Sequence, residues 1–456
     1  MALTKATERM FDGTTISVRD FGATGDGSTD DTAAIQAAIT AAKTASGANR
    51  VMFPDGQYQV TSINLVGCED IRFVGEGNAS LVGTSVGGTA VIDMNGGTST
   101  ASRRLILDRI KIGLASGASY DYAIDISYMT DSAFYGLYAV GDFDTAIVNI
   151  NYSWNNNFYA TELQSVTATG LSGVTCGSNN VNNNNWYGGR IKGASGSTAT
   201  GITARGTANS YFGLDVSIFD TAFQLSSSTA TKVDGCYFEL IGTRHFYFDG
   251  TTNNTLVTGS YLVMNNNNKG VDVNGATGSH KGVSFIGNSL IDNGSSQVGF
   301  ELESNVFDVV LLNNFDDGIT TPLDIDNATA NELTQKIGPI ITESKLMRLQ
   351  TGDGISGEAV FVSTGKYNGS SAQDIIRAAR GHGLFTVGIR ISATDFRNEI
   401  WSVNIEDDGT TVNAVKLNAN PSAITGVTFA VAVGQLTVAD SVGSNDTTLC
   451  GYWNYT

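Results

Sequence analysis

Short stretches that alternate apolar residues with polar or small ones recur along the middle of the chain. An alternation of this kind has the period of a β-strand and not of a helix. The copies begin roughly 21 to 31 residues apart, a period at which one structural repeat stacks on the next. The copies are 122–126, 145–147, 169–171, 200–202, 221–225, 244–248, 269–273, 298–302 and 321–325. The pattern predicts an all-β solenoid, a parallel β-helix.

A second strand repeats in the segments 157–164, 185–192, 210–217 and 232–239, and these can be aligned on one apolar column. Its members must point inward, and they are Leu163, Ile191, Val216 and Phe238. Because side chains alternate across a strand, the neighbours on both sides point outward. One outward row reads Glu162, Arg190, Asp215 and Tyr237, and the other reads Gln164, Lys192, Ser217 and Glu239.

Asp215 and Glu239 form the preferred pair of carboxylates on this wall. With coils ~4.8 Å apart and residues two apart on a strand ~6.6 Å apart, their backbones lie roughly 8 Å from each other. A separation of ~6.5–9.5 Å lets one carboxyl group protonate a glycosidic oxygen while the other activates water. Glu162 and Asp215, with Arg190 between them, are the rival pair.

Other side chains would orient a sugar on the wall: Arg190, Lys192, Tyr237 and, at the start of another strand, His245. The alternative is that the wall carries charge ladders whose role is structural. A register error of one residue would also turn half of these side chains inward. For His245, a structural role with hydrogen bonds is the competing interpretation.

The two ends of the chain have different patterns. Residues 1–15 read as a lead, and 16–80 as a strand, a glycine-rich turn, a helix from Thr32 to about Lys43 and the first coils. The helix would cap the open end of the β-helix body, 81–330, with Asp30 and Asp31 accepting hydrogen bonds from its first amides. Residues 331–345 read as a connector and 346–456 as a C-terminal antiparallel β-sandwich.

The composition of the chain makes several classes of partner unfavourable. The formal net charge of −18 makes nucleic acid an unfavourable partner. No apolar run is long enough for membrane insertion, and the first residues lack the apolar core of a signal peptide. Cys68, Cys176, Cys236 and Cys450 have no metal-ligand spacing, so we expect buried thiols, no metal and no cofactor.

The segment Ile16–Ala42, followed by 51–58 and 71–77, closely resembles the N-terminal cap and first coils of the pectate-lyase-like superfamily. Within that group it is most similar to bacteriophage tailspike depolymerases. The resemblance implies a right-handed parallel β-helix and a homotrimer, with the N-terminus bound to a phage tail or baseplate protein. It also implies a virion tail protein that is assembled in the host cytoplasm and acts on a bacterial surface polysaccharide at the host cell surface. The C-terminal module would serve trimerisation or carbohydrate binding.

Three activities follow as expectations. Hydrolysis by Glu239 and Asp215, with Glu162 in reserve, is preferred. β-Elimination is the alternative, in which Tyr237 or Lys192 removes the proton beside a uronate whose charge Arg190 neutralises. A receptor-binding protein that binds sugar on the same wall without cleaving it is the third. A secreted polysaccharide enzyme of a free-living microbe is disfavoured by the missing signal peptide.

Overall fold

The computed structural model describes residues 14–325 except for short gaps at 45–48, 97–100, 178–179, 266–267, 275–277 and a few positions between 296 and 320. Beyond residue 325 it describes strand segments only. The chain divides into two compact units, residues 1–243 and 244–456. Among the described residues, no helix is long and apolar enough to cross a membrane.

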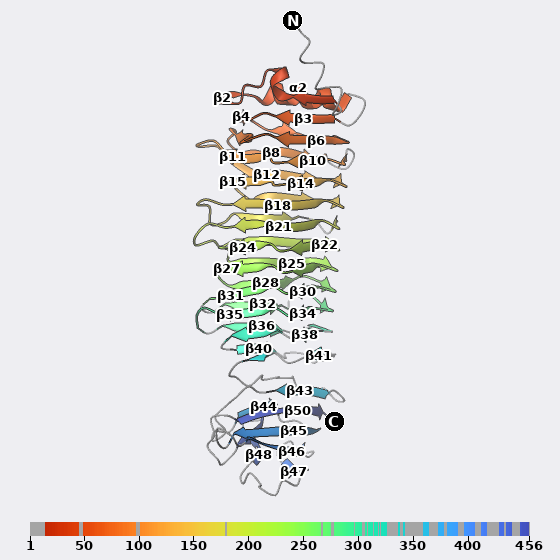
Figure 1. The fold of residues 1–456 in the computed structure, drawn as a ribbon, viewed down its shortest axis with the longest axis vertical. Helices are drawn as coiled ribbons and strands as arrows, with labels where there is room; N and C mark the ends of the chain where they lie inside the picture. Colours follow the sequence, from red (N-terminus) through yellow and green to blue (C-terminus); the bar gives the residue numbers. More distant parts are fainter. Residues whose placement is uncertain are drawn as a thin grey trace. The chain divides into compact units, whose positions relative to one another are not determined.

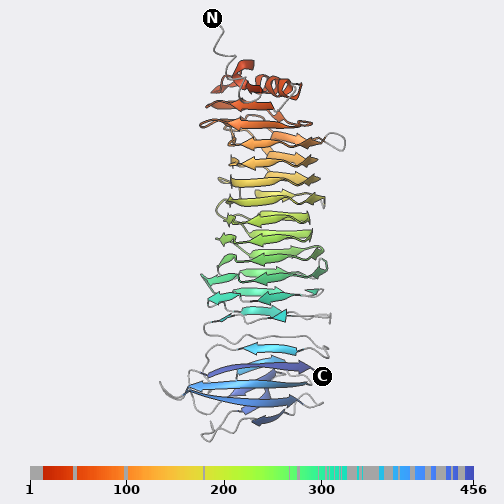
Figure 2. The same ribbon diagram turned by 45° about the vertical axis from the view of Figure 1, so that its right-hand side comes forward.

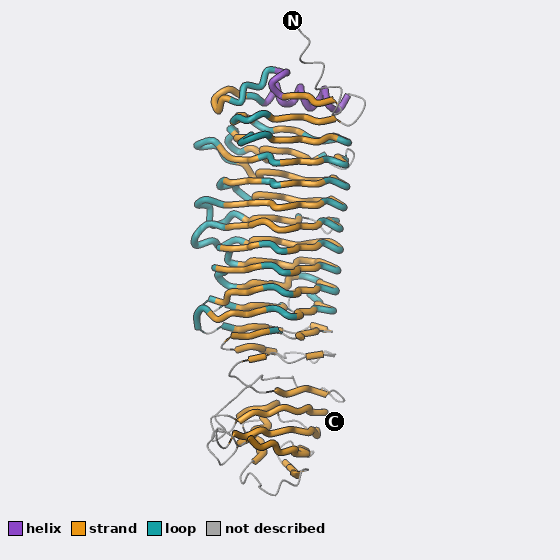
Figure 3. Tube along the Cα trace, viewed as in Figure 1, coloured by secondary structure: helices purple, strands orange, loops and turns teal. Residues whose placement is uncertain are grey.

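Three long ladders and one short ladder of parallel strands build the first unit, and successive coils are stacked as Figures 1, 2 and 3 show. The first ladder contains β1 (Thr14–Ser17), β3 (Asn49–Phe53), β6 (Ile71–Gly75), β10 (Ile106–Asp108), β14 (Ala133–Tyr135), the starts of β18 (Asn157–Gln164) and β21 (Asn185–Lys192), β23 (Ser210–Phe212) and β26 (Lys232–Asp234). The second ladder contains β2 (Asp26–Asp30), β4 (Gln57–Val60), β7 (Ser80–Gly83), β11 (Lys111–Leu114), β15 (Tyr138–Val140), the ends of β18 and β21, β24 (Asp215–Ser217) and β27 (Tyr237–Glu239).

The third ladder contains β5 (Ile63–Asn64), β8 (Gly88–Asn95), β12 (Tyr120–Ser127), β16 (Ala146–Asn151), β19 (Ser172–Cys176), β22 (Thr200–Thr207) and β25 (Thr221–Thr229). A short ladder follows it: β9 (Ser102–Arg103), β13 (Met129–Thr130), β17 (Ser153–Trp154) and β20 (Val181–Asn182). The parallel pairing confirms the predicted β-solenoid, while its right-handed winding stays a prediction.

The predicted helix is α2 (Thr32–Thr44), which follows the short 3-10 helix η1 (Val18–Phe21). It buries Ile35 and Ile39 together with two alanines. The side chain of Gln36 exchanges two hydrogen bonds with the backbone of Asn64 in β5, each 3.1 Å long. The helix therefore supplies partners to the edge of the third ladder, where β5 has no strand before it in the part of the chain that the structure describes.

The two aspartates at the start of this helix differ from each other. Asp30 accepts a hydrogen bond from the amide of Thr32 at 2.9 Å, as predicted. The Asp31 carboxylate instead accepts from the amides of Thr24 and Gly25, at 2.7 and 3.0 Å. Its predicted contact with helix amides is wrong because the glycine-rich turn folds back over it.

The core of the first unit is made of inward columns that continue from coil to coil. Leu163, Ile191, Val216 and Phe238 are all fully buried and paired in register, which confirms the predicted column. At one corner, buried asparagines connect successive coils: Asn156 donates to Asn184 at 2.8 Å, and the amide of Asn184 donates to Asn209 at 2.9 Å. The corners thereby satisfy backbone groups that lie outside the strand ladders.

The second unit contains further parallel coil strands. They form four ladders. One contains β28 (Arg244–Asp249), β32 (Lys269–Val273), β36 (Val298–Leu302) and β40 (Thr321–Ile325), and a second contains β30 (Leu256–Thr258), β34 (Ser284–Ile286), β38 (Val310–Leu312) and β41 (Lys336–Ile337). A third contains β31 (Tyr261–Met264), β35 (Ser289–Asp292), β39 (Phe315–Asp317) and β42 (Ile341–Thr342), and the fourth contains β29 (Thr252–Asn253), β33 (His280–Lys281) and β37 (Val306–Phe307). Parallel pairing thus continues past the predicted end near residue 330, through two-residue strands too short for a sequence pattern to reveal. Most of the predicted connector, 331–345, lies outside the described residues.

Two antiparallel sheets follow in the second unit. One has the order β43 (Ala359–Ser363), β50 (Thr447–Tyr455), β45 (Gly381–Arg390), β46 (Phe396–Ile405) and β47 (Val412–Lys416). The other has the order β44 (Gln373–Arg377), β49 (Gln435–Ala439) and β48 (Thr428–Ala432). The antiparallel pairing agrees with the expectation for 346–456, and the packing of the sheets as a sandwich stays a prediction.

Candidate functional site

The outer wall of the second ladder carries the predicted charged rows in the predicted register. Strand pairing places Glu162 beside Arg190, Arg190 beside Asp215 and Asp215 beside Tyr237. The other row pairs Lys192 with Ser217 and Ser217 with Glu239. Asp215 and Glu239 therefore occupy the diagonal positions on adjacent coils from which the separation of roughly 8 Å follows.

One member of these rows differs from the prediction. Ser217 is fully buried, although it belongs to the row that was expected to face outward. Lys192 and Glu239, which flank it in the ladder, remain partly exposed. Because it is buried, Ser217 does not offer a contact to a ligand.

Asp215 lies between opposing influences. Its Oδ2 atom forms an ion pair with Nε of Arg190 at 3.4 Å, and its Oδ1 atom is buried without a hydrogen-bond partner among the described residues. Burial raises the pKa of the Asp215 carboxyl group above its usual value, the charge of Arg190 lowers it, and the negative charge of Glu239 raises it. The balance is a raised pKa, which favours a carboxyl group that holds its proton.

Glu239 has a different environment on the next coil. The hydroxyl of Tyr237 donates a hydrogen bond to its Oε2 atom at 2.9 Å, and the two residues are two positions apart on β27. This hydrogen bond orients the Glu239 carboxylate on the wall. Asp215 and Glu239 thus meet the requirement that an acid and a base occupy different environments.

Glu162 lies two coils away from Asp215 in the same row, and its side chain is exposed. Arg190 occupies the position between the two acids and pairs with Asp215. Glu162 stays on the same wall as the other candidates, but it is two coils from Asp215 whereas Glu239 is one coil away.

His245 does not join this group. It lies in the second unit, is fully buried, and its ring nitrogens lie 2.9 and 3.4 Å from the carbonyl oxygens of Val263 and Lys269. Burial lowers its pKa to about 4. A buried ring bound to backbone carbonyls does not suit a residue that contacts sugar, so the structural interpretation holds and His245 leaves the candidate set.

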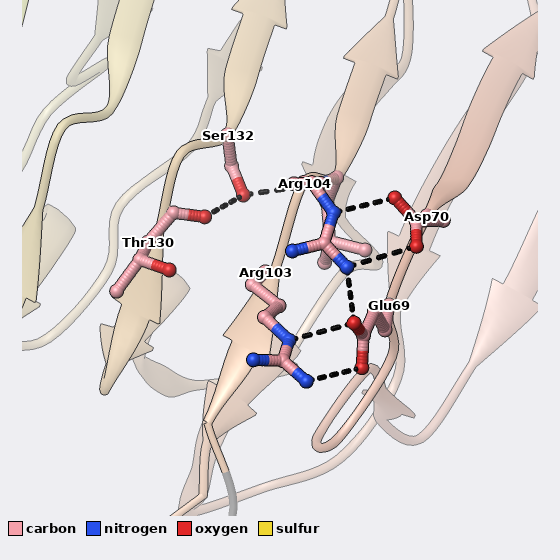
Figure 4. A network of polar contacts seen from close by, with 7 residues as sticks. Glu69, Asp70, Arg103, Arg104, Thr130 and Ser132 are labelled. Carbon is pink, nitrogen blue, oxygen red and sulfur yellow. Dashed lines mark hydrogen bonds and ion pairs between the residues drawn. The ribbon is translucent and has the colours of Figure 1, made fainter.

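A second charged cluster in the first unit is balanced internally (Figure 4). Arg103 pairs with Glu69 at 2.7 Å, while Arg104 pairs with Asp70 at 2.6 Å and also with Glu69. These arginines lower the pKa of both carboxyl groups. Two cations and two anions that neutralise each other offer little to a ligand, so this cluster fits a structural role.

The cysteines give no sign of a metal site. Cys68, Cys176 and Cys236 are buried, and burial raises the pKa of each thiol to about 11. Among the described residues, no group of three or more histidine, cysteine or acidic side chains is arranged to hold a metal ion. The side chain of Cys450 lies outside the described residues.

The sequence analysis missed an aromatic column beside the charged rows. It consists of Tyr135, Tyr159, Tyr187 and Phe212, one outward residue of the first ladder on each of four consecutive coils. Their rings stack with centroids 4.8, 4.9 and 5.2 Å apart. The signal was present in the sequence, because a pair of adjacent aromatic residues recurs roughly every 24 to 28 positions from 134–135 to 211–212.

Comparisons with known proteins include short sequence matches to polysaccharide-modifying enzymes and matches of the fold. The chain is 44% identical over 84 residues to mannuronan C5-epimerase AlgE1 of Azotobacter vinelandii, which covers 18% of this chain and 6% of that protein. It is 44% identical over 75 residues to alginate lyase 7 of the same organism, covering 16% of this chain and 8% of the relative. The chain thus spans under a tenth of the length of either relative.

One solved structure with a similar fold is a double-mutant tailspike protein of E. coli bacteriophage HK620. It aligns with 97% of this chain and 94% of its own at a TM-score of 0.55, with 11% sequence identity. This likeness shows the fold. A family model described as rhamnogalacturonase A/epimerase, pectate lyase-like, matches residues 15–320, which is more than half of the sequence. The chain therefore belongs to the pectate-lyase-like family of rhamnogalacturonase A and the epimerases.

Proposed function

We propose that this protein is a phage tailspike that binds and depolymerises a bacterial surface polysaccharide, such as a capsule, exopolysaccharide or O-antigen. The observation that carries the proposal is the pair of carboxyl groups on the outer wall of a pectate-lyase-like solenoid. Asp215 has a raised pKa, and Glu239, one coil away, accepts a hydrogen bond from Tyr237. The fold shared with a phage tailspike supports this assignment.

Hydrolysis is the preferred reaction. Asp215 would act as the general acid and donate its proton to the glycosidic oxygen as the bond from that oxygen to the anomeric carbon breaks. Glu239 would act as the general base and take a proton from the water that attacks the anomeric carbon from the opposite face. The separation of about 8 Å leaves room for this water and predicts inversion of the anomeric configuration.

The remaining wall residues would hold the sugar. Arg190 and Lys192 are cations in the two outward rows and would bind hydroxyl or carboxylate groups of the polysaccharide. Tyr237 would hold Glu239 in the orientation for water activation. Glu162 is the reserve carboxylate, and it would replace Glu239 as partner of Asp215 if the sugar chain crosses Arg190.

β-Elimination is the second candidate, and the similarity to an alginate lyase and a mannuronan epimerase favours it. In this reaction Tyr237 would take the proton at the carbon beside a uronate carboxylate and pass its own hydroxyl proton to Glu239. The electrons of the broken C–H bond would form a double bond as the glycosidic oxygen leaves and takes a proton from water. Arg190 would neutralise the uronate charge.

The assembly follows from the tailspike assignment. We propose a homotrimer in the virion tail that acts at the host cell surface, with residues 1–15 attached to another tail or baseplate protein. The α2 helix would cap the first coil, and residues 346–456 would serve trimerisation or sugar binding. Sedimentation of the whole chain should give roughly three times the monomer mass of 47.8 kDa, and a monomer at micromolar concentration would contradict the trimer.

The direct test is incubation with a panel of purified capsular and O-antigen polysaccharides and alginate, followed by mass analysis of released oligosaccharides. Hydrolysis adds one water per cleaved bond, whereas elimination leaves an unsaturated end that absorbs ultraviolet light. Binding without any released product would reduce the proposal to a non-cleaving receptor-binding protein. Neither binding nor product on a broad panel would reject it.

A further inference from the structure

The aromatic column of the first ladder, Tyr135, Tyr159, Tyr187 and Phe212, presents a rigid strip to solvent. Tyr135 and Tyr187 are 41% and 37% exposed, although each is packed against a neighbouring ring. Because the rings stack face to face, the strip shows their edges and the hydroxyl groups of three tyrosines. Exposed aromatic patches of this kind usually mark a binding surface.

A line of small residues separates the aromatic column from the charged rows. Between Tyr187 and Arg190 the chain has only Gly188 and Gly189, and Gly213 follows Phe212 in the same way. A side chain at Gly188 or Gly213 would meet nothing within 4 Å, so the space in front of both is open. The backbone there is accessible between two lines of long side chains.

On the other side of the aromatic column, polar side chains occupy the outward position two residues earlier. Asn157 and Asn185 are paired in register, and the amide of Asn185 donates to the side-chain oxygen of Asn157 at 3.2 Å. Each amide group has two donors and one acceptor that can take two bonds. A band of amides, ring edges, phenols and open backbone therefore runs along the coils next to the carboxylates.

We propose that the aromatic column, the glycines Gly188 and Gly213, and the Asn157–Asn185 pair form a polysaccharide-binding track. The track lies along the coils of the first unit and positions the sugar chain so that a glycosidic bond reaches Asp215 and Glu239. This inference rests on the proposed function and adds the element that sets where the chain is cut. The occupant is a chain of sugars, because the amides and phenols can exchange hydrogen bonds with sugar hydroxyl groups, and the partly positive ring edges suit sugar hydroxyl oxygens.

The stacked arrangement explains why such a track would bind effectively. Each ring is held by its neighbours, so little side-chain entropy is lost when a ligand binds. The hydroxyl groups of the column are protonated at neutral pH, as in any tyrosine, and can donate hydrogen bonds to a sugar. At the Phe212 end of the column, Nζ of Lys232 lies 5.1 Å from the centroid of the Phe212 ring and 3.2 Å from Oδ2 of Asp234. The stack of rings ends at this ion pair.

The test compares binding of the panel polysaccharides in affinity electrophoresis, with the Glu239→Gln variant as the parent so that the polymer is not degraded. Tyr159→Ala combined with Tyr187→Ala should weaken binding by about tenfold or more, since tyrosine is enriched among the residues that carry most of the binding energy at interfaces. Tyr159→Phe with Tyr187→Phe keeps the stack and removes only the hydroxyls, and should weaken binding about threefold. In the active protein the alanine pair should raise KM and leave kcat nearly unchanged.

Tyr152→Ala is the matched control. Tyr152 is 38% exposed and stacks on Tyr128 with centroids 4.9 Å apart, but it lies outside the first and second ladders. It should not change binding. If the ladder variants fold and bind as tightly as this control, the track is wrong while the proposed function stands. If the parent binds no polysaccharide at all, the proposed function fails and the track fails with it.

Discussion

At Asp215, neighbouring charges act on one carboxyl group in opposite directions. Burial and the charge of Glu239 raise its pKa, and Arg190 lowers it through an ion pair at 3.4 Å. Glu239 has a different environment, because it accepts a hydrogen bond from the hydroxyl of Tyr237. The two carboxyl groups are thereby suited to different roles, one as general acid and one as general base. Substitutions of single residues test this proposal most directly.

Removing either proton-transfer group should strongly reduce cleavage. Because an acid and a base each contribute on the order of 10²–10⁴ in rate, Asp215→Asn and Glu239→Gln should each lower kcat at least about a hundredfold. The isosteric amides keep the shape of the wall, so the melting temperature should remain nearly constant. Oligosaccharide release from the polysaccharide identified in the panel measures the rate.

Asp121→Asn provides the matched control, because Asp121 is an exposed carboxylate of the same unit on the third ladder. It should retain full activity. Full activity in both Asp215→Asn and Glu239→Gln would remove this pair from the mechanism and direct attention to Glu162.

The pH dependence of kcat/KM should show how Arg190 affects the pKa of Asp215. Asp215 must be protonated to act as the acid, so activity falls as pH rises through its pKa. Arg190 lowers that pKa, so Arg190→Ala should move the alkaline limb of the kcat/KM profile to higher pH while KM rises. Lys192→Ala should raise KM with a smaller displacement of the limb. An alkaline limb that stays in place in Arg190→Ala would show that Asp215 is not the titrating acid.

At the scale of single elements, the corners decide whether the strands can stack. Short strands such as β23 and β24 have three residues each, so much of the backbone lies in turns whose polar groups need partners. Buried Asn184 meets this need, because its side chain donates to the carbonyl of Ser153 at 3.0 Å and accepts from Asn156. The wall that carries the candidate site depends on such corners for its register.

Replacing Asn184 should therefore destabilise the first unit. Asn184→Ala leaves a buried carbonyl and a buried amide without partners, each of which costs about 1–3 kcal/mol, so a loss of roughly 2–6 kcal/mol is expected. Urea unfolding measures this loss. Asn183→Gly is the neighbouring control: Asn183 is exposed with φ of 52°, a backbone conformation that glycine adopts readily. Equal stability of the two variants would contradict a structural role for the buried asparagines.

At the scale of the whole molecule, the chain has a net charge of −18 and divides into two compact units. The second unit contains the buried His245 and His280, and burial lowers the pKa of both. A histidine whose pKa is lower in the folded state binds fewer protons there than in the unfolded state. Its contribution to stability is thus complete above the unfolded pKa near 6.5 and is lost as the pH falls toward about 4.

We expect acid to destabilise the second unit in this window. A shift from 6.5 to about 4 corresponds to roughly 3 kcal/mol for His245. His245→Gln can keep a donor toward the carbonyl of Val263 and cannot titrate, so its unfolding free energy should fall less steeply between about pH 6.5 and 4. Denaturant unfolding across this range measures the slope. An identical slope in the variant would mean that His245 does not carry the effect.

The sequence alone determined the elements that repeat. The alternation and its period predicted the coils of the first unit, the inward column that includes Leu163 and Phe238, and the rows that carry Asp215 and Glu239. These features follow from local rules, since a strand has a period of two and a solenoid has a nearly constant repeat. The stacked aromatic column was also encoded in the sequence, as recurring pairs of aromatic residues. Aligning those pairs by the same repeat would have predicted it.

Only the tertiary structure decided what each side chain experiences. Burial depends on neighbours from other coils, which is why Ser217 is covered in an outward row and His245 is buried at a strand start. The pKa of Asp215 is raised by burial and by Glu239 and lowered by Arg190, both on adjacent coils, and the carboxylate of Asp31 contacts a turn instead of its own helix. A pattern gives the direction of a side chain, but its solvation and charge come from contacts between residues far apart in the sequence.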